Sequence, residues 1–119
     1  MPKTTLVLGA TPNTDRYAYK ATEMLLKYGH PVVLYGIKAG EIAGITIQNK
    51  APQQEVDTVT LYVGPQNQPA YYDYIIGLKP TRVIFNPGTE NPEFENKLKH
   101  HNIEPVIACT LVMLATGQY

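Results

Sequence analysis

The sequence has a single cysteine and no tryptophan, and its 119 residues carry no net charge at neutral pH. One thiol excludes a disulfide within the chain, and Cys109 and the three scattered histidines do not have the spacing of metal ligands. The basic and acidic residues balance without forming a basic run, which argues against nucleic acid or an anionic membrane as a partner. We therefore predict no metal site and expect a small-molecule ligand.

Long hydrophobic runs are also missing. The apolar run that begins at residue 5 is too short for a signal sequence or a membrane span, so we expect a cytoplasmic protein. The chain length falls within the usual range of one domain, and no repeat or linker interrupts it. Residues 1–119 are therefore predicted to form a single domain.

Five short apolar segments rich in branched residues are typical of strands that are buried on both faces. These segments are residues 4–8, 31–35, 58–63, 82–85 and 105–108. Helical patterns lie between them: one after a cap at Asn13 or Thr14, one from Pro69, one from Asn91 and a short one over 110–115. Residues 36–57 are expected to form an irregular crossover with a possible helical turn near 39–43.

This alternation predicts right-handed crossovers and an α/β fold. We expect a Rossmann-like, doubly wound, five-stranded parallel sheet in a three-layer α/β/α arrangement. Ligands of such sheets bind at the carboxyl ends of the strands, near the point where the strand order reverses. The loops that begin at Gly9, Tyr35, Val63, Asn86 and Cys109 are therefore the candidates for a site.

The first of these loops has the features of a phosphate site. It joins a strand to a helix through the small or turn-forming residues Gly9, Ala10, Thr11 and Asn13. Free N–H groups at a helix start favour an anion, and Arg16 could add a forked cation for a diphosphate. The alternative is an ordinary turn with a capping side chain and an arginine in solvent.

Two well-known nucleotide motifs are absent from this loop. It lacks the central glycines of G-x-G-x-x-G and the lysine of the P-loop, which disfavours both. An NAD site would also need an acidic residue after the second strand, where this chain has Lys38. A lysine suits a phosphorylated ribose, although an exposed lysine without a role is an equal alternative.

Two further loops could complete the cleft. Val63-Gly64-Pro65 forms a turn that could lie against an adenine ring, or could simply end the strand. Asn86-Pro87-Gly88 contains a Pro-Gly pair that favours a type II turn, whose backbone groups could line the cleft.

No catalytic arrangement is visible in the sequence. Glu90 has no evident partner, and His100 and His101 are explained by the negative end of a helix dipole. Cys109 is expected to be a buried structural residue. Because neither a triad nor a carboxylate pair is found, we predict no catalytic residues and no enzyme activity.

Four stretches together resemble the small bacterial CoA-binding domain family, the stand-alone relatives of the CoA-binding domain of the succinyl-CoA synthetase alpha subunit. They are residues 8–13 with Arg16 and Tyr19, residues 38–44, residues 86–91, and Cys109. The resemblance implies coenzyme A or an acyl-CoA as ligand, with its diphosphate on Gly9, Thr11, Asn13 and Arg16. It also implies Lys38 near the phosphorylated ribose or diphosphate, Val63 to Pro65 beside the adenine, and Asn86 to Gly88 nearer the pantetheine.

We thus expect a CoA-binding module without catalytic machinery, such as a carrier, sensor or regulatory subunit. Two alternatives remain open: an NAD(P)-binding, oxidoreductase-like module, and an interaction protein that kept the fold without the ligand. A homodimer or another protein partner is compatible with each of them.

Overall fold

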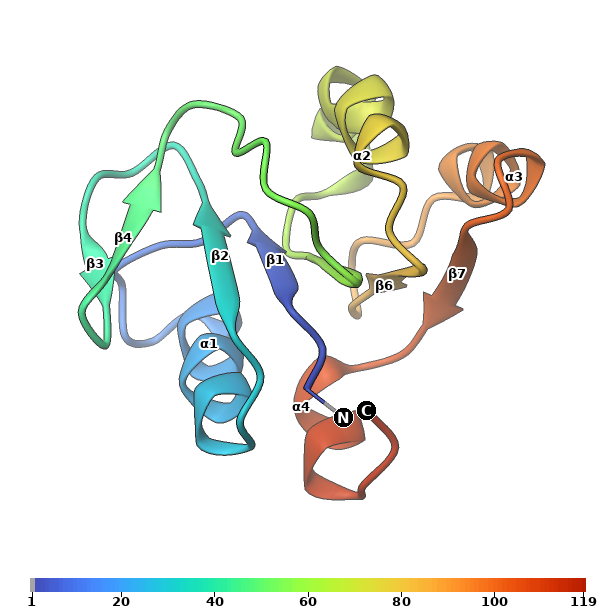
Figure 1. Ribbon diagram of the computed structural model, residues 1–119. Helices are drawn as coiled ribbons and strands as arrows, with labels where there is room; N and C mark the ends of the chain where they lie inside the picture. The colour runs from blue at the N-terminus through green and yellow to red at the C-terminus, as the bar shows by residue number, and fades with distance from the viewer. Residues whose placement is uncertain (1) are drawn as a thin grey trace.

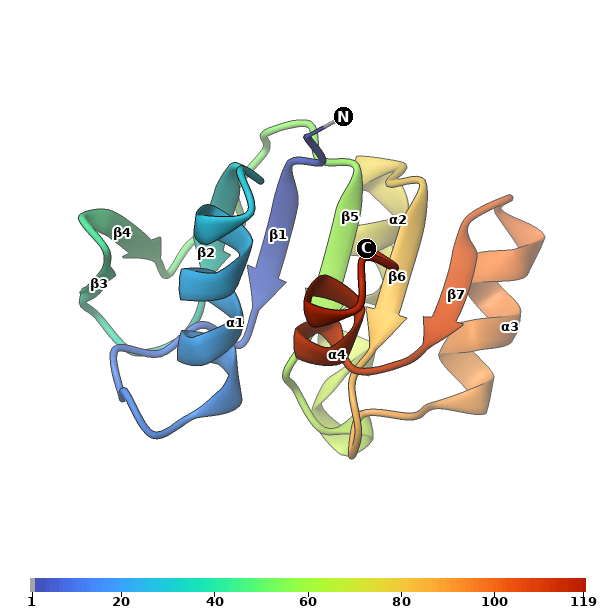
Figure 2. The ribbon, with the colours of Figure 1, turned by 90° about the horizontal axis from the view of Figure 1, so that it is seen from below.

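The computed structural model describes residues 2–119 and shows a sheet that is covered by helices on both faces (Figure 1). Figure 2 places α1 and α4 on one face, and α2 and α3 on the other. The elements are β1 (Thr5–Leu8), α1 (Tyr17–Lys27), β2 (Val32–Tyr35), β3 (Glu41–Ile42), β4 (Ile45–Gln48), β5 (Thr58–Leu61), α2 (Tyr72–Leu78), β6 (Arg82–Phe85), α3 (Pro92–His100), β7 (Glu104–Ile107) and α4 (Thr110–Ala115).

The sheet has seven strands in the order β3-β4-β2-β1-β5-β6-β7. All neighbouring pairs are parallel except β3 and β4, and Leu6 of β1 lies opposite Val33 on one side and Val59 on the other. From β1 the chain moves outward to β2, whereas from β5 it moves the other way to β6. The fold is therefore Rossmann-like, as predicted, and its strand order reverses between β1 and β5.

The prediction of five strands and a helical turn near 39–43 was wrong, because residues 41–48 form a β-hairpin. Ala43 and Gly44 both have positive φ values, 51° and 81°, as a two-residue turn between strands requires. The hairpin pairs β3 with β4, and Ile47 of β4 then aligns with Leu34 of β2. Residues 41–48 thus extend the parallel sheet by two short strands.

Two apolar clusters, one on each face of the sheet, form the core. On the side of α2 and α3, Phe94 stacks on Tyr72, with ring centroids 4.3 Å apart, and contacts Phe85 edge to face. On the side of α1, Leu25 packs with Leu34 and other buried residues. The side chains of β1, β5 and β6 are all buried. Burial on both faces explains why β1 and β6 show no polar–apolar alternation, whereas β5 alternates through its buried residues Thr58 and Thr60.

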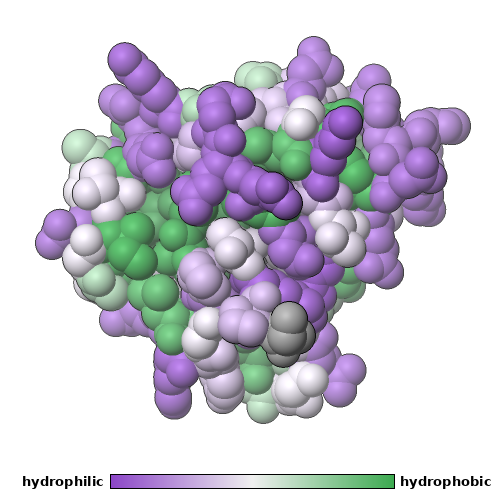
Figure 3. Space-filling view, viewed as in Figure 1, coloured by the Kyte–Doolittle hydropathy of each residue, from purple (hydrophilic) through white to green (hydrophobic). Residues whose placement is uncertain are grey.

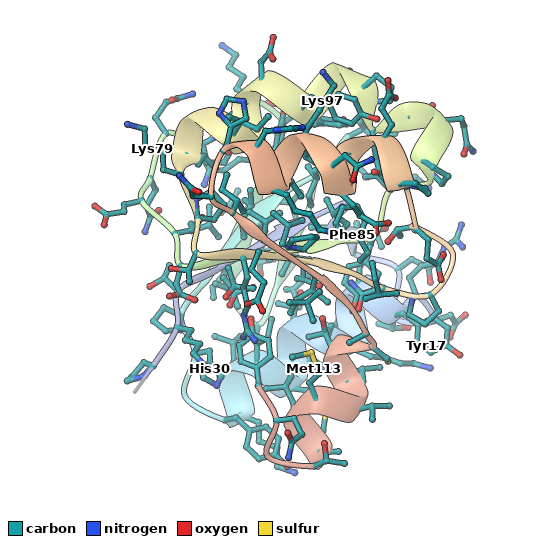
Figure 4. All side chains as sticks on the ribbon, turned by 90° about the vertical axis from the view of Figure 1, so that its right-hand side faces the viewer. Tyr17, His30, Lys79, Phe85, Lys97 and Met113 are labelled. Atoms are coloured by element: carbon teal, nitrogen blue, oxygen red, sulfur yellow. The ribbon has the colours of Figure 1, made fainter. Side chains whose placement is uncertain are left out.

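Figure 4 shows Tyr17 and His30 at opposite ends of the sheet, with Phe85 between the sheet and α3. The face seen in Figure 3, around the amino ends of the strands, is mostly hydrophilic, with its apolar residues gathered mainly on the left. No helix within residues 2–119 has the length and apolar character to cross a bilayer.

Candidate functional site

A cavity of about 990 Å³ lies at the carboxyl ends of β1, β2, β5 and β6. Figure 2 shows the loops after β1, β5 and β6 at the same edge of the sheet. The cavity adjoins the reversal between β1 and β5, where Rossmann-like folds bind their ligands. Its volume lies at the upper end of the roughly 300–1,000 Å³ that is usual for small-molecule sites.

Glycines allow the loops around the cavity to approach one another closely. Gly9 has a φ of 99°, and a Cβ atom there would lie 2.8 Å from the main-chain oxygen of Tyr62. A Cβ atom on Gly36 would lie only 2.1 Å from the oxygen of Ala10. The N–H groups of Gly9 and Ala10 both donate to the oxygen of Tyr35, at 2.9 and 3.1 Å. Gly9 and Ala10 therefore form the bottom of the cavity, and their N–H groups are already hydrogen-bonded within the protein.

The start of α1 supplies the anion-binding features that remain. Arg16 is the N-cap, and no side chain caps the helix. The first-turn residues Tyr17 and Ala18 line the cavity together with Arg16. Because the first N–H groups of a helix have no partner within it, the α1 start offers donors and a partial positive charge.

The predicted cap at Asn13 or Thr14 was wrong, because the chain bends sharply before the helix. The Oδ1 of Asn13 accepts from the N–H of Asp15 at 3.0 Å, and the Oγ1 of Thr11 accepts from that of Asn13 at 3.3 Å. Asn13 does not line the cavity, whereas Thr11 does. Asn13 thus shapes the loop and Thr11 faces the site.

Charged side chains line only one part of the cavity. They are Asp15 and Arg16 from the loop after β1, and Lys38 from the loop after β2. All three are exposed. We call this part, together with the α1 start, the charged half.

The opposite part of the lining carries no charge, and we call it the neutral half. It is formed by the loops after β5 and β6 and consists of Tyr62, Val63, Gly64, Asn67, Ala70, Tyr71, Pro87, Gly88 and Thr89. Pro65 begins a 3-10 turn just outside the lining. Four of the predicted site residues therefore lie together in the neutral half: Val63, Gly64, Pro87 and Gly88. Pro65 is adjacent to them.

Asn86 lies beneath the cavity and not on its wall. Its side chain is 2% exposed and donates to the Oγ1 of Thr60 at 2.7 Å and to the oxygen of Leu61 at 2.8 Å. Its Oδ1 accepts from the N–H of Thr110 at 2.9 Å. Asn86 thus joins β5, β6 and the start of α4, a structural role that the sequence did not reveal.

Gln68 is another buried polar residue, and the sequence analysis did not identify it as part of the site. It is 1% exposed, and its Nε2 donates to the oxygen of Val63 at 2.9 Å and to that of Thr89 at 2.7 Å. Its Oε1 accepts from the Nδ2 of Asn91 at 3.0 Å. Gln68 therefore holds together the two loops that form the neutral half.

Tyrosines contribute a large part of the lining, which was also missed. Tyr35 and Tyr71 meet edge to face, with ring centroids 5.7 Å apart. Burial raises the pKa of Tyr62 to about 12, and burial together with Tyr71 raises the pKa of Tyr35. At neutral pH these phenols are therefore protonated and able to donate hydrogen bonds.

The comparison with known families is decisive. The family model described as the CoA binding domain matches residues 3–115. The chain belongs to the CoA-binding domain family. No curated protein matches it. The cavity of this CoA-binding domain contains Gly9, Ala10, Thr11, Arg16, Lys38, Val63, Gly64, Pro87 and Gly88 of the predicted site.

Solved structures agree with this fold. A crystal structure described as that of an uncharacterized protein is 58% identical and covers 100% of this chain and 99% of its own, with a TM-score of 0.98. A Thermus thermophilus protein described as cell-free ID.343 is 24% identical, with coverages of 99% and 91% and a TM-score of 0.87.

One similar structure is part of a larger protein. It is a dinucleotide-forming acetyl-coenzyme A synthetase of Ca. Korarchaeum cryptofilum, in complex with phosphate and ADP. The match is 18% identical with a TM-score of 0.69, and it covers 90% of this CoA-binding domain but 26% of the synthetase chain. At this identity the likeness concerns the fold alone.

Other groups with possible chemistry lie outside the cavity lining. Cys109 is partly exposed, which corrects the expectation of a buried thiol, and it does not line the cavity. Within residues 2–119, no three histidine, cysteine or acidic side chains gather as metal ligands would. The carboxylate of Glu90 accepts a hydrogen bond from the N–H of Gly88 at 2.8 Å, next to the neutral half of the cavity.

Proposed function

We propose that this CoA-binding domain holds CoA or a short acyl-CoA in the cavity, with its phosphates at the loops after β1 and β2. The observation that carries the proposal is the division of the lining into a charged half and a neutral half. CoA has the same division, since its phosphates lie on the adenosine end and its pantetheine arm is uncharged. This correspondence between the two halves of the lining and the two ends of CoA also sets the orientation of the ligand, with its phosphates in the charged half and its pantetheine arm in the neutral half.

Each half has residues suited to its part of the ligand. The start of α1 and the guanidinium of Arg16 are suited to the diphosphate, and the hydroxyl of Thr11 can donate to it. Lys38 on the neighbouring loop is suited to the phosphorylated ribose. Val63 and Gly64 offer a flat wall for the adenine, and Pro87 and Gly88 are suited to the pantetheine.

We further propose that the domain binds without catalysis, as a carrier, sensor or regulatory subunit. Among the described residues, those that line the cavity include no histidine, no cysteine and no pair of carboxylates. General acid–base or nucleophilic catalysis commonly relies on such groups. The raised pKa values of Tyr35 and Tyr62 make these phenols poor bases.

The alternative ligand, NAD(P), is less suited to the same loops. Counted from Gly9, Thr11 stands where a dinucleotide fingerprint needs glycine for close approach of the pyrophosphate, and Thr14 stands where it needs the third glycine. Gly36, Ile37 and Lys38 follow β2, where NAD requires a carboxylate for the ribose hydroxyls.

A thermal-shift comparison of CoA, dephospho-CoA, NAD and NADP at equal concentrations tests the proposal. At equal concentration, a ligand that binds only the folded state raises the melting temperature more, the more tightly it binds. We expect CoA to give the largest rise. A larger rise with NADP would support the oxidoreductase-like alternative, and no rise with any nucleotide would leave the interaction protein.

A further inference from the structure

The carboxylate of Glu90 borders the neutral half of the cavity and is held there by a hydrogen bond. Glu90 accepts a hydrogen bond from the N–H of Gly88, and Gly88 itself lines the cavity. This N–H would otherwise be free to bind an anionic ligand group. A protein carboxylate therefore already occupies the anion donor at this end.

Further carboxylates lie at the same edge of the sheet. Glu93 and Glu95 belong to the first turn of α3, which follows the loop after β6. Glu93 accepts from the hydroxyl of Tyr72 at 3.2 Å, and Glu95 accepts from the N–H of Asn91 at 3.2 Å. The cation Lys97 lies one turn further along α3, over the ring of Tyr72 at 6.0 Å, and does not line the cavity.

We infer that this site selects acyl-CoA thioesters by the charge of the acyl group: it accepts free CoA and short uncharged acyl chains, and it disfavours acyl chains that end in a carboxylate. The inference rests on the proposed function and adds the class of acyl group. It follows from placing the pantetheine arm along the neutral half, which brings the acyl group toward Gly88 and Glu90.

Two physical effects act against an acyl carboxylate there. Repulsion by Glu90 is one, and it reaches over about 8 Å at physiological ionic strength. The other is the lack of a cation among the neutral-half residues, so a carboxylate that gives up water gains no charged partner. A methyl-terminated chain has neither disadvantage and can contact the ring of Tyr71.

Calorimetric titration with free CoA, butyryl-CoA and succinyl-CoA tests the inference, because the two thioesters have acyl chains of four carbons and differ in the terminal carboxylate. We expect butyryl-CoA to bind within about threefold of CoA, and succinyl-CoA to bind at least about tenfold more weakly than butyryl-CoA. Equal or tighter binding of succinyl-CoA would overturn the inference.

The variant Glu90→Gln identifies the origin of the discrimination. The glutamine amide oxygen can still accept from the N–H of Gly88, so the turn is kept while the charge is removed. We expect the ratio of the succinyl-CoA to butyryl-CoA dissociation constants to fall by about threefold. The matched control Glu104→Gln removes an exposed carboxylate at the amino end of β7, at the edge of the sheet away from the cavity. It should leave this ratio unchanged.

The same titrations separate this inference from the proposed function. If CoA binds but Glu90→Gln does not change the ratio, the role of Glu90 is wrong and the proposed function stands. If neither CoA nor its thioesters bind, the proposed function is wrong, and the inference about the acyl group is wrong with it.

Discussion

The side chain of Gln68 donates a hydrogen bond to the main-chain oxygen of Thr89 at 2.7 Å, beneath the cavity. The same Nε2 also donates to the oxygen of Val63 at 2.9 Å. One buried amide thus joins the loop after β5 to the loop after β6. Since both loops line the neutral half, Gln68 acts as a positioning residue for the proposed ligand.

Replacing Gln68 with leucine should weaken both stability and CoA binding. The variant removes the donor to two main-chain oxygens, and it leaves the Nδ2 of Asn91 with the hydroxyl of Tyr72 as its remaining acceptor, so we expect a loss of about 1–3 kcal/mol of unfolding free energy. Urea unfolding gives this value, and the exposed Gln54→Leu serves as the control. CoA affinity should fall even at temperatures where the variant is fully folded, and an unchanged affinity there would contradict the positioning role.

Replacing Gly36 with alanine should destabilise the fold by about 1–3 kcal/mol, because the new methyl group overlaps the main chain. Its Cβ would lie 2.1 Å from the oxygen of Ala10, and a main-chain atom cannot move aside as a side chain can. The control is Gly77→Ala in α2, where nothing lies within 4 Å of the added Cβ. That change should raise the unfolding free energy by about 0.5–1 kcal/mol, since alanine favours helix.

Removing either cation of the charged half should weaken CoA binding. We expect about a tenfold loss for Arg16→Ala, because a forked guanidinium makes strong charge-assisted bonds to phosphate. Lys38→Ala should cost less for dephospho-CoA than for CoA. Titration of both ligands decides the assignment, since an equal loss on the two would disprove the contact between Lys38 and the ribose phosphate. Lys50→Ala, at an exposed lysine outside the lining, is the matched control.

Asp15 should oppose the ligand, because it lines the charged half beside Arg16. We expect Asp15→Asn to tighten CoA binding by about threefold, as removal of one exposed like charge would do. The gain should shrink at high salt, where exposed charges are screened. A salt-independent change would show that the substitution acts through the shape of the loop.

Stability should decrease below about pH 6.5 through His30. Burial, followed by the charges of Lys3 and Arg82, lowers the pKa of this imidazole from 6.5, and its Nδ1 accepts from the N–H of Lys3 at 3.0 Å. As the pH falls below 6.5, His30 is protonated in the unfolded chain before it is protonated in the folded chain. The unfolding free energy therefore decreases as the pH falls, until the lower pKa of the folded state is reached. Unfolding free energies measured with urea at several pH values should change less steeply with pH for His30→Gln than for His101→Gln. An equal pH dependence in the two variants would contradict this role.

The parallel sheet could be predicted from the sequence because its buried strands β1, β5 and β6 are short segments rich in apolar and branched residues. The start of α3 was equally clear, since the Oδ1 of Asn91 accepts from the N–H of Phe94, as a capping asparagine does. The hairpin of β3 and β4 was missed because its turn is Ala43-Gly44, and alanine is not a usual residue at positive φ.

The site was predictable in position but not in detail. Loops that follow parallel strands must meet at one edge, so the predicted glycines and cations lie around one cavity. Which polar side chain turns inward depends on contacts between distant segments, as for Asn86 with Thr110 and Gln68 with Thr89. The tyrosines of the lining could not be identified from the sequence, because nothing local distinguishes a wall of the cavity from the core.

We propose that CoA occupies this cavity with its phosphates at the start of α1. Amide chemical shifts recorded by NMR during titration with CoA test it most directly. We expect the largest changes at Thr11, Tyr17, Ala18, Gly64 and Gly88, and almost none at Lys79 or Asn102, which lie toward the amino ends of the strands. Unchanged amide shifts at Tyr17 and Ala18 under saturating CoA would contradict this position of the phosphates.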